Sequence, residues 1–221
     1  MKLFIFAILA LLSTSLCATS RTPEMVSFGT ADGGTIHADY YPASGTMAVV
    51  LAHGAIFNKT SWRELAGQLS ANQIGALAID FRGYGKSKSG GRASDRFQDI
   101  LAAMRYLHRQ KNIEQVAVLG ASMGGGAAGT AAVHAQKGEI SRLLPLSPVS
   151  IANPEKINAG KILYIASEKE AGIKSIKAQY QRAPSPKRLE LLPGRAHAQH
   201  IFNTKEKSAL TATIIEFLRE Q

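Results

Sequence analysis

Short apolar runs alternate along this chain with segments in which apolar residues recur every three or four positions. The run at 47–52, MAVVLA, is apolar throughout, which is typical of a strand buried on both faces of a parallel sheet. Similar runs follow at 75–80, 116–120, 143–147, 162–166 and 189–192. Two earlier segments, 25–31 and 35–41, flank Asp32-Gly33-Gly34, and an Asp-Gly between strand patterns predicts a hairpin.

The segments between these runs predict helices. Trp62, Leu65 and Leu69 recur at helical spacing, and a fuller stripe runs from Phe97 to Leu107, with Ser94 or Asp95 as its expected N-cap. Apolar residues at the same spacing close the chain between 210 and 218. A hairpin followed by repeated β-α units predicts an α/β fold: one mostly parallel, twisted sheet with helices on both faces.

The first 19 residues differ from the rest. Lys2 precedes an apolar run at 3–12, and small residues follow, which is the pattern of a cleaved signal peptide. The run is shorter than the roughly 20 apolar residues of a membrane-spanning helix, so we expect no stable membrane insertion. We therefore assign 1–19 to a signal peptide and 20–221 to one domain, and expect a secreted or periplasmic protein.

Cys17 is the only cysteine, and it falls within this leader. Leu16 stands where lipoprotein signals usually carry a small residue, which argues against lipid anchoring at Cys17. A mature protein without cysteine has neither an internal disulfide nor a thiolate metal site. The net charge is +10, but the basic residues are scattered, so we interpret them as a solvated surface and expect no nucleic-acid partner.

The pentapeptide Gly120-Ala121-Ser122-Met123-Gly124 follows an apolar run and precedes a helix of small residues. Such a G-x-S-x-G turn places a serine hydroxyl on a sharp strand-to-helix bend, where small neighbours let the backbones approach. A serine hydroxyl needs a base and an orienting acid to act as a nucleophile. Ser122 is therefore the candidate nucleophile.

The candidate base is His197, just after the last apolar run, with His200 as the competitor. The acid should follow the run at 162–166, where Glu170 and Glu168 are both available, and we favour Glu170. Two backbone N–H groups complete an oxyanion hole in acyl transfer. We expect these from Met123, next to the serine, and from Ala55, after the run at 47–52.

These residues resemble the α/β-hydrolase superfamily over essentially the whole mature chain. The resemblance is carried by His53-Gly54, by the D-x-R-G-x-G-x-S stretch from Asp80 to Ser87, by the Ser122 turn, and by 194–197. It implies the α/β-hydrolase fold, structural roles for His53, Asp80 and Arg82, and no metal or organic cofactor. Glu170 departs from the aspartate that is usual at its place.

The resemblance further implies a small serine hydrolase that cleaves carboxylic esters of small acyl substrates, with Ser122, His197 and Glu170 as catalytic residues. The segment between the runs at 143–147 and 162–166 is short, where many relatives insert a helical lid. We therefore expect an open cleft, as in small esterases and dienelactone-hydrolase-like proteins. A peptidase, a thioesterase, or a catalytically weak binding protein on the same fold are the alternatives.

Overall fold

The computed structural model describes residues 22–110 and 112–220, so the predicted signal peptide lies outside the described residues. Within this part of the chain, eight strands form one sheet in the order β1-β2-β4-β3-β5-β6-β7-β8. Only β2 runs antiparallel to its neighbours, and the pairs from β3 to β8 are parallel. The predicted α/β-hydrolase architecture is confirmed.

The hairpin strands and the six that follow agree with the predicted runs to within a few residues. The strands are β1 (Glu24–Gly29), β2 (Thr35–Tyr41), β3 (Met47–Ala52), β4 (Gly75–Ile79), β5 (Gln115–Ala121), β6 (Arg142–Leu146), β7 (Lys161–Ser167) and β8 (Lys187–Leu192). In the hairpin turn, the N–H of Thr30 donates to Gly34 O (2.9 Å), and Gly33 takes a φ of 86° that favours glycine.

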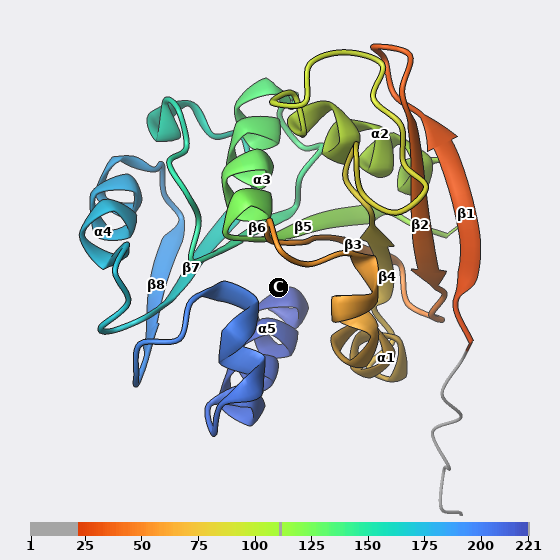
Figure 1. Ribbon diagram of the computed structural model, residues 1–221. Helices are drawn as coiled ribbons and strands as arrows, with labels where there is room; N and C mark the ends of the chain where they lie inside the picture. The colour runs from red at the N-terminus through yellow and green to blue at the C-terminus, as the bar shows by residue number, and fades with distance from the viewer. Residues whose placement is uncertain (1–21, 111, 221) are drawn as a thin grey trace, which may run out of the picture.

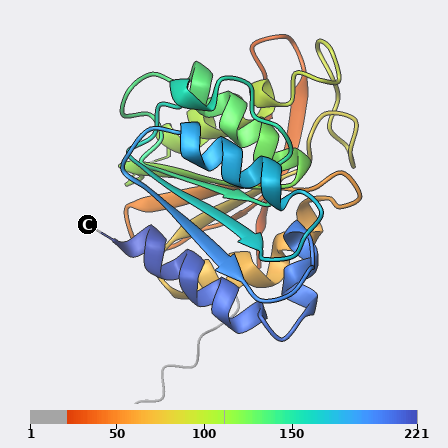
Figure 2. The ribbon, with the colours of Figure 1, turned by 90° about the vertical axis from the view of Figure 1, so that its left-hand side faces the viewer.

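Two layers of helices cover the sheet (Figures 1 and 2). The helices are α1 (Arg63–Ala71), α2 (Phe97–His108), α3 (Met123–His134), α4 (Ile173–Arg182) and α5 (Lys207–Arg219), with 3-10 turns η1 (Lys59–Trp62), η2 (Pro154–Lys156) and η3 (Ala198–Asn203). One apolar core joins the sheet to α2, α3 and α4 through residues such as Ile100, Ala128 and Ile176. The other joins it to α1 and α5 through residues such as Leu69 and Ile214.

Between β6 and β7 the chain carries only the short turn η2, so no lid covers this edge of the sheet, as predicted. No helix in the described ranges is long and apolar enough to cross a membrane. The expected N-cap of α2 was wrong: the cap residue is Arg96, and the carboxylate of Asp95 instead binds Arg92 (3.1 Å).

The Asp80–Ser87 stretch anchors the loop after β4. Asp80 accepts a hydrogen bond from the N–H of Lys59 (2.8 Å). The guanidinium of Arg82 is fully buried and bonds Asp99 on α2 (2.7 Å) and Asp32 in the hairpin turn (2.7 Å). Although burial alone would lower the pKa of Arg82, these two carboxylates raise it, so the side chain stays charged. The architectural roles predicted for Asp80 and Arg82 are confirmed.

Candidate active site

Ser122 occupies the sharp turn between β5 and α3, with a φ of 51° and a ψ of −112°. Residues other than glycine rarely adopt this backbone conformation. A hydrogen bond from the N–H of Ser122 to Leu146 O (2.9 Å) helps to hold it. A Cβ on Gly120 would overlap the carbonyl oxygen of Gly124, and a Cβ on Gly124 would overlap that of Ala52. The glycines of the pentapeptide are therefore required by close backbone approach, as the sequence predicted.

The structure brings Ser122, His197 and Glu170 into one hydrogen-bonded chain. Ser122 Oγ lies 2.8 Å from His197 Nε2, and His197 Nδ1 lies 2.6 Å from Glu170 Oε2. The Glu170 side chain is fully buried, whereas 46% of the His197 side chain is exposed. Ser122 itself is partly exposed, so the hydrogen-bonded chain runs from a buried carboxylate to a hydroxyl that solvent can reach.

The two competing residues lie outside this chain of hydrogen bonds. Glu168 is exposed, and only its backbone N–H is engaged, with Leu192 O (2.9 Å). His200 is exposed in η3, with its ring centroid 5.2 Å from that of Phe57. Of the open alternatives, the structure thus joins Glu170 and His197 to Ser122.

Two buried serines that the sequence analysis did not single out hold the His197 loop. Ser167, at the end of β7, donates from Oγ to Ala196 O (2.6 Å). Ser147, just after β6, accepts at Oγ from the N–H of Ala198 (3.0 Å). The peptides on both sides of His197 are therefore tied to the carboxyl ends of neighbouring strands, which fixes the position of the imidazole.

The loop after β3 lies against the start of α3. Tyr84 Oη donates to Ala55 O (2.8 Å) and lies 3.8 Å from Met123 Sδ, so Ala55 and Met123 are neighbours beside Ser122. Gln199 is buried and accepts at Oε1 from the N–H of Gly54 (2.7 Å). The two residues expected to form the oxyanion hole thus both contact the Tyr84 hydroxyl, Ala55 through its carbonyl oxygen and Met123 through its sulfur.

His53 is fully buried beneath this loop. Its Nε2 accepts from the N–H of Phe81 (3.2 Å), which leaves the proton on Nδ1, 2.8 Å from Gly54 O. Burial lowers the pKa of His53 and favours this neutral form. The side chain links the ends of β3 and β4, which confirms its expected structural role.

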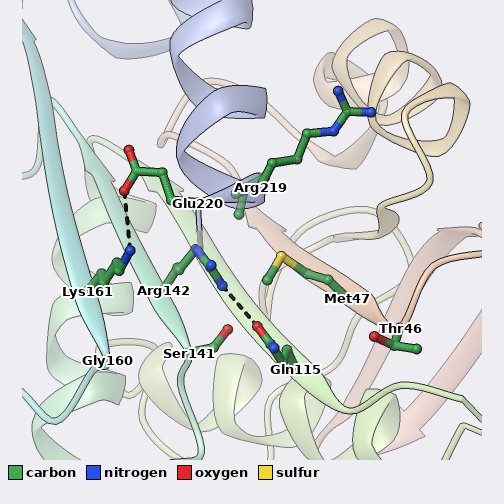
Figure 3. A pocket seen from close by; sticks show the side chains of 10 residues that line it. Thr46, Met47, Gln115, Ser141, Arg142, Gly160, Lys161, Arg219 and Glu220 are labelled. Atoms are coloured by element: carbon green, nitrogen blue, oxygen red, sulfur yellow. Dashed lines mark hydrogen bonds and ion pairs between the residues drawn. The ribbon is translucent and has the colours of Figure 1, made fainter.

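Two hollows lie at opposite edges of the sheet. One, of about 210 Å³, lies along the first turns of α3, with Met123, the chain neighbour of Ser122, and Val149 in its wall. A larger one, of about 580 Å³, lies among the first residues of β3, β5, β6 and β7. In Figure 3 its polar side chains pair with one another. Arg142 donates a hydrogen bond to Gln115 (2.9 Å), and Lys161 forms an ion pair with Glu220 (3.6 Å). Ligands of open α/β sheets bind at the carboxyl ends of the strands, and the smaller hollow is on that side, because Met123 directly follows Ser122 at the end of β5.

Comparison with known proteins gives the same superfamily. The family model described as serine aminopeptidase, S33, matches residues 43–171, which is more than half of the chain. Monoglyceride lipases of Rattus norvegicus and Homo sapiens are 29% and 27% identical over 155 residues. This alignment covers 65% of this chain and 51% of the lipases, so the chain spans about half the length of the curated relatives it matches.

Solved structures share the fold over most of their length. A Pyrococcus furiosus esterase superimposes with a TM-score of 0.77 at 16% identity, covering 89% of this chain and 90% of the esterase. An esterase of Exiguobacterium antarcticum gives 0.74 at 15% identity, covering 89% of this chain and all of that one (100%). A dienelactone hydrolase of Anabaena variabilis gives 0.69 at 17% identity, with 89% and 97% covered. By its fold and by the family model that matches it, the chain belongs to the serine aminopeptidase S33 family of the α/β-hydrolase superfamily.

Proposed function

We propose that this protein hydrolyses carboxylic esters through an acyl-enzyme formed on Ser122. The observation that carries the proposal is the hydrogen-bonded chain from Ser122 Oγ through His197 to the buried carboxylate of Glu170. The monoglyceride lipases among the relatives and the esterases among the similar structures support an ester as the substrate class.

In this mechanism, Ser122 Oγ attacks the acyl carbon while its proton passes to His197 Nε2. The imidazolium then gives this proton to the leaving alcohol as the ester C–O bond breaks. Water next attacks the acyl carbon and gives a proton to Nε2. The bond between the acyl carbon and Ser122 Oγ then breaks, Nε2 returns the proton to Oγ, and the acid leaves. Glu170 accepts the hydrogen bond from Nδ1 throughout, so Nε2 is the nitrogen that takes up the proton.

The tetrahedral intermediate carries a negative oxygen that needs preorganised donors. We assign these to the N–H groups of Met123 and Ala55, and the contacts that Tyr84 Oη makes with Ala55 O (2.8 Å) and Met123 Sδ (3.8 Å) support this assignment. Each donor of this kind contributes roughly 10²–10³ in rate. The start of α3 adds a favourable dipole at the same point.

The test is hydrolysis of 4-nitrophenyl esters of increasing chain length by residues 20–221. We expect Ser122→Ala and His197→Ala each to lower kcat by roughly 10³–10⁶, and the double variant to lose little more than either one, because the two side chains act as a unit. Unchanged turnover in Ser122→Ala would overturn the acyl-enzyme proposal, and additive losses would show that the two residues act independently.

A peptidase is the second candidate, because the matching family is described as a serine aminopeptidase. The same groups would cleave an amide if His197 protonated the leaving amine. Aminoacyl 4-nitroanilides distinguish the two activities: cleavage of anilides at a kcat/KM equal to or above that of the esters would favour the peptidase.

We further propose that the protein acts outside the cytoplasm, because 1–19 carry the signal-peptide pattern described above. Expression of the full sequence in a Gram-negative host tests this. A mature N-terminus near residue 20 in the periplasmic fraction is the expected result, and uncleaved protein in the cytoplasm would contradict it.

A further inference from the structure

The hollow beside Ser122 has a distinct chemical character. Its wall includes Met123, the neighbour of the nucleophile, and Val149, whose N–H donates to Ser122 O (3.1 Å). Phe97, Thr130 and Ser150 also line the hollow. The only charged side chain among the described residues that line it is Arg96.

The charge of Arg96 is not balanced within the described residues. Its Nε is buried without a hydrogen-bond partner. The nearest carboxylates in sequence are already bound elsewhere: Asp95 pairs with Arg92 (3.1 Å), and Asp99 pairs with Arg82 (2.7 Å). Arg96 as a whole is partly exposed, and the planar fork of its guanidinium suits bidentate binding of a carboxylate through the terminal nitrogens.

Arg96 also acts electrostatically near the reacting groups. Burial is the main cause that lowers the pKa of His53, and the positive charge of Arg96 acts in the same direction. His53 lies directly below the loop that carries Ala55.

Arg96 and residues of α3 line the same hollow, so the positions of the α3 residues relate the hollow to the nucleophile. Gly126 and Thr130 line the hollow about one and two turns along α3 from Ser122, or roughly 6 and 12 Å at 1.5 Å per residue. A ligand bound at both Ser122 and Arg96 therefore needs a short spacer between its ester and its anionic group. Phe97 and Val149 give that spacer apolar walls.

We infer that Arg96 forms an anion subsite, and that the preferred substrates are esters carrying a carboxylate on a short chain. This inference rests on the proposed esterase function and names its substrate class. The carboxylate would bind the Arg96 guanidinium while the ester carbonyl lies at Ser122 Oγ. The net charge of +10 would favour the encounter with such anions at low ionic strength.

The test compares two esters of similar length, 4-nitrophenyl hexanoate and mono-4-nitrophenyl adipate, in wild type and in Arg96→Gln. We expect Arg96→Gln to lower kcat/KM roughly tenfold to hundredfold for the adipate monoester only, because a hydrogen bond to a charged group is lost. Arg96→Lys should restore part of the loss, since the charge returns without the planar fork. Arg105→Gln, which removes the same charge from an exposed position of the same helix, should change neither rate more than about twofold.

Equal effects of Arg96→Gln on both esters, or equal effects of Arg96→Gln and Arg105→Gln on the adipate monoester, would overturn the subsite. Failure of the proposed function is seen separately, as hexanoate turnover that persists in Ser122→Ala or is absent in wild type. Calorimetric titration with adipate itself needs no turnover. Binding that Arg96→Gln weakens at least tenfold supports the subsite, and binding that it leaves unchanged, or no binding to wild type, overturns it.

Discussion

Two glutamates only two positions apart illustrate what decides function at the scale of single residues. Both follow β7, and the resemblance to the α/β-hydrolase superfamily favoured Glu170 by its position. Glu168 comes first after the strand and points into solvent. Glu170 lies two residues further along, and its side chain is fully buried. Its Oε2 accepts a hydrogen bond from His197 Nδ1, and its Oε1 has no partner among the described residues. A buried carboxylate with a single polar partner is costly, which is consistent with a role in orienting His197.

Glu170→Gln tests this role. A glutamine amide can donate to Nδ1 and would then place the imidazole proton on Nε2, where it blocks transfer from Ser122. We expect kcat for 4-nitrophenyl esters to fall roughly 10³–10⁴-fold, as for the wrong imidazole tautomer in other serine hydrolases. The matched control is Glu168→Gln, which should stay within twofold of wild type. A large loss in the control, or a small one in Glu170→Gln, would reverse the assignment of the acid.

At the scale of elements, the strands were predictable because five of them, β3 to β7, are short apolar runs buried on both faces. Helix α4 was not predicted: it exposes most of its residues and buries only Ile176 and Gln179, so its apolar stripe is too sparse to recognise. Ser122, His197 and Glu170 were predictable because each lies within a few residues of the carboxyl end of a strand. Ser147, Ser167 and Gln199 were not, because each holds the site through a bond to a residue 29–145 positions away.

Gln199 connects two of these elements, since η3 follows His197 and the Gly54 N–H belongs to the loop after β3. Its Nε2 also donates to Ser61 Oγ (2.6 Å). We predict that Gln199→Ala lowers kcat for neutral esters roughly tenfold to hundredfold with little change in KM, because the oxyanion loop loses its anchor. Gln199→Glu keeps an oxygen acceptor for Gly54 and should recover most of the rate.

A control separates positioning from general loss of stability. Ser61→Ala removes the second partner of Gln199, together with the bond from Ser61 Oγ to Asn58 O (2.6 Å), but leaves the bond to Gly54, and it should leave kcat within about threefold. Circular dichroism melting of all three variants shows whether they fold alike. If kcat and the melting temperature fell in parallel in Gln199→Ala and Ser61→Ala, the role of Gln199 would be one of stability alone.

On the scale of the whole molecule, basic residues outnumber acidic ones by ten, and two of the carboxylates neutralise the fully buried Arg82. Arg82 joins three distant parts of the chain: the β1–β2 turn through Asp32, its own loop after β4, and α2 through Asp99. Hydrogen bonds from Arg82 and then from Thr30 hold the pKa of Asp32 below its ordinary value. A lowered folded pKa means that this stabilisation is complete above the unfolded pKa of about 3.9 and is lost as the pH falls through the folded value.

Acid sensitivity of the hairpin end of the sheet follows from this. We predict that Asp32→Asn lowers the free energy of unfolding by on the order of 1 kcal/mol at pH 6, and that the difference from wild type narrows below about pH 4, as Asp32 in wild type becomes protonated. Urea titrations followed by circular dichroism between pH 6 and pH 3 measure both curves. Asp95→Asn is the control, because its partner Arg92 is 83% exposed and such pairs contribute little, so its curve should follow wild type at every pH. If the difference in the free energy of unfolding between Asp32→Asn and wild type stayed constant down to pH 3, Asp32 would stabilise the hairpin by its shape and hydrogen bonds rather than by its charge.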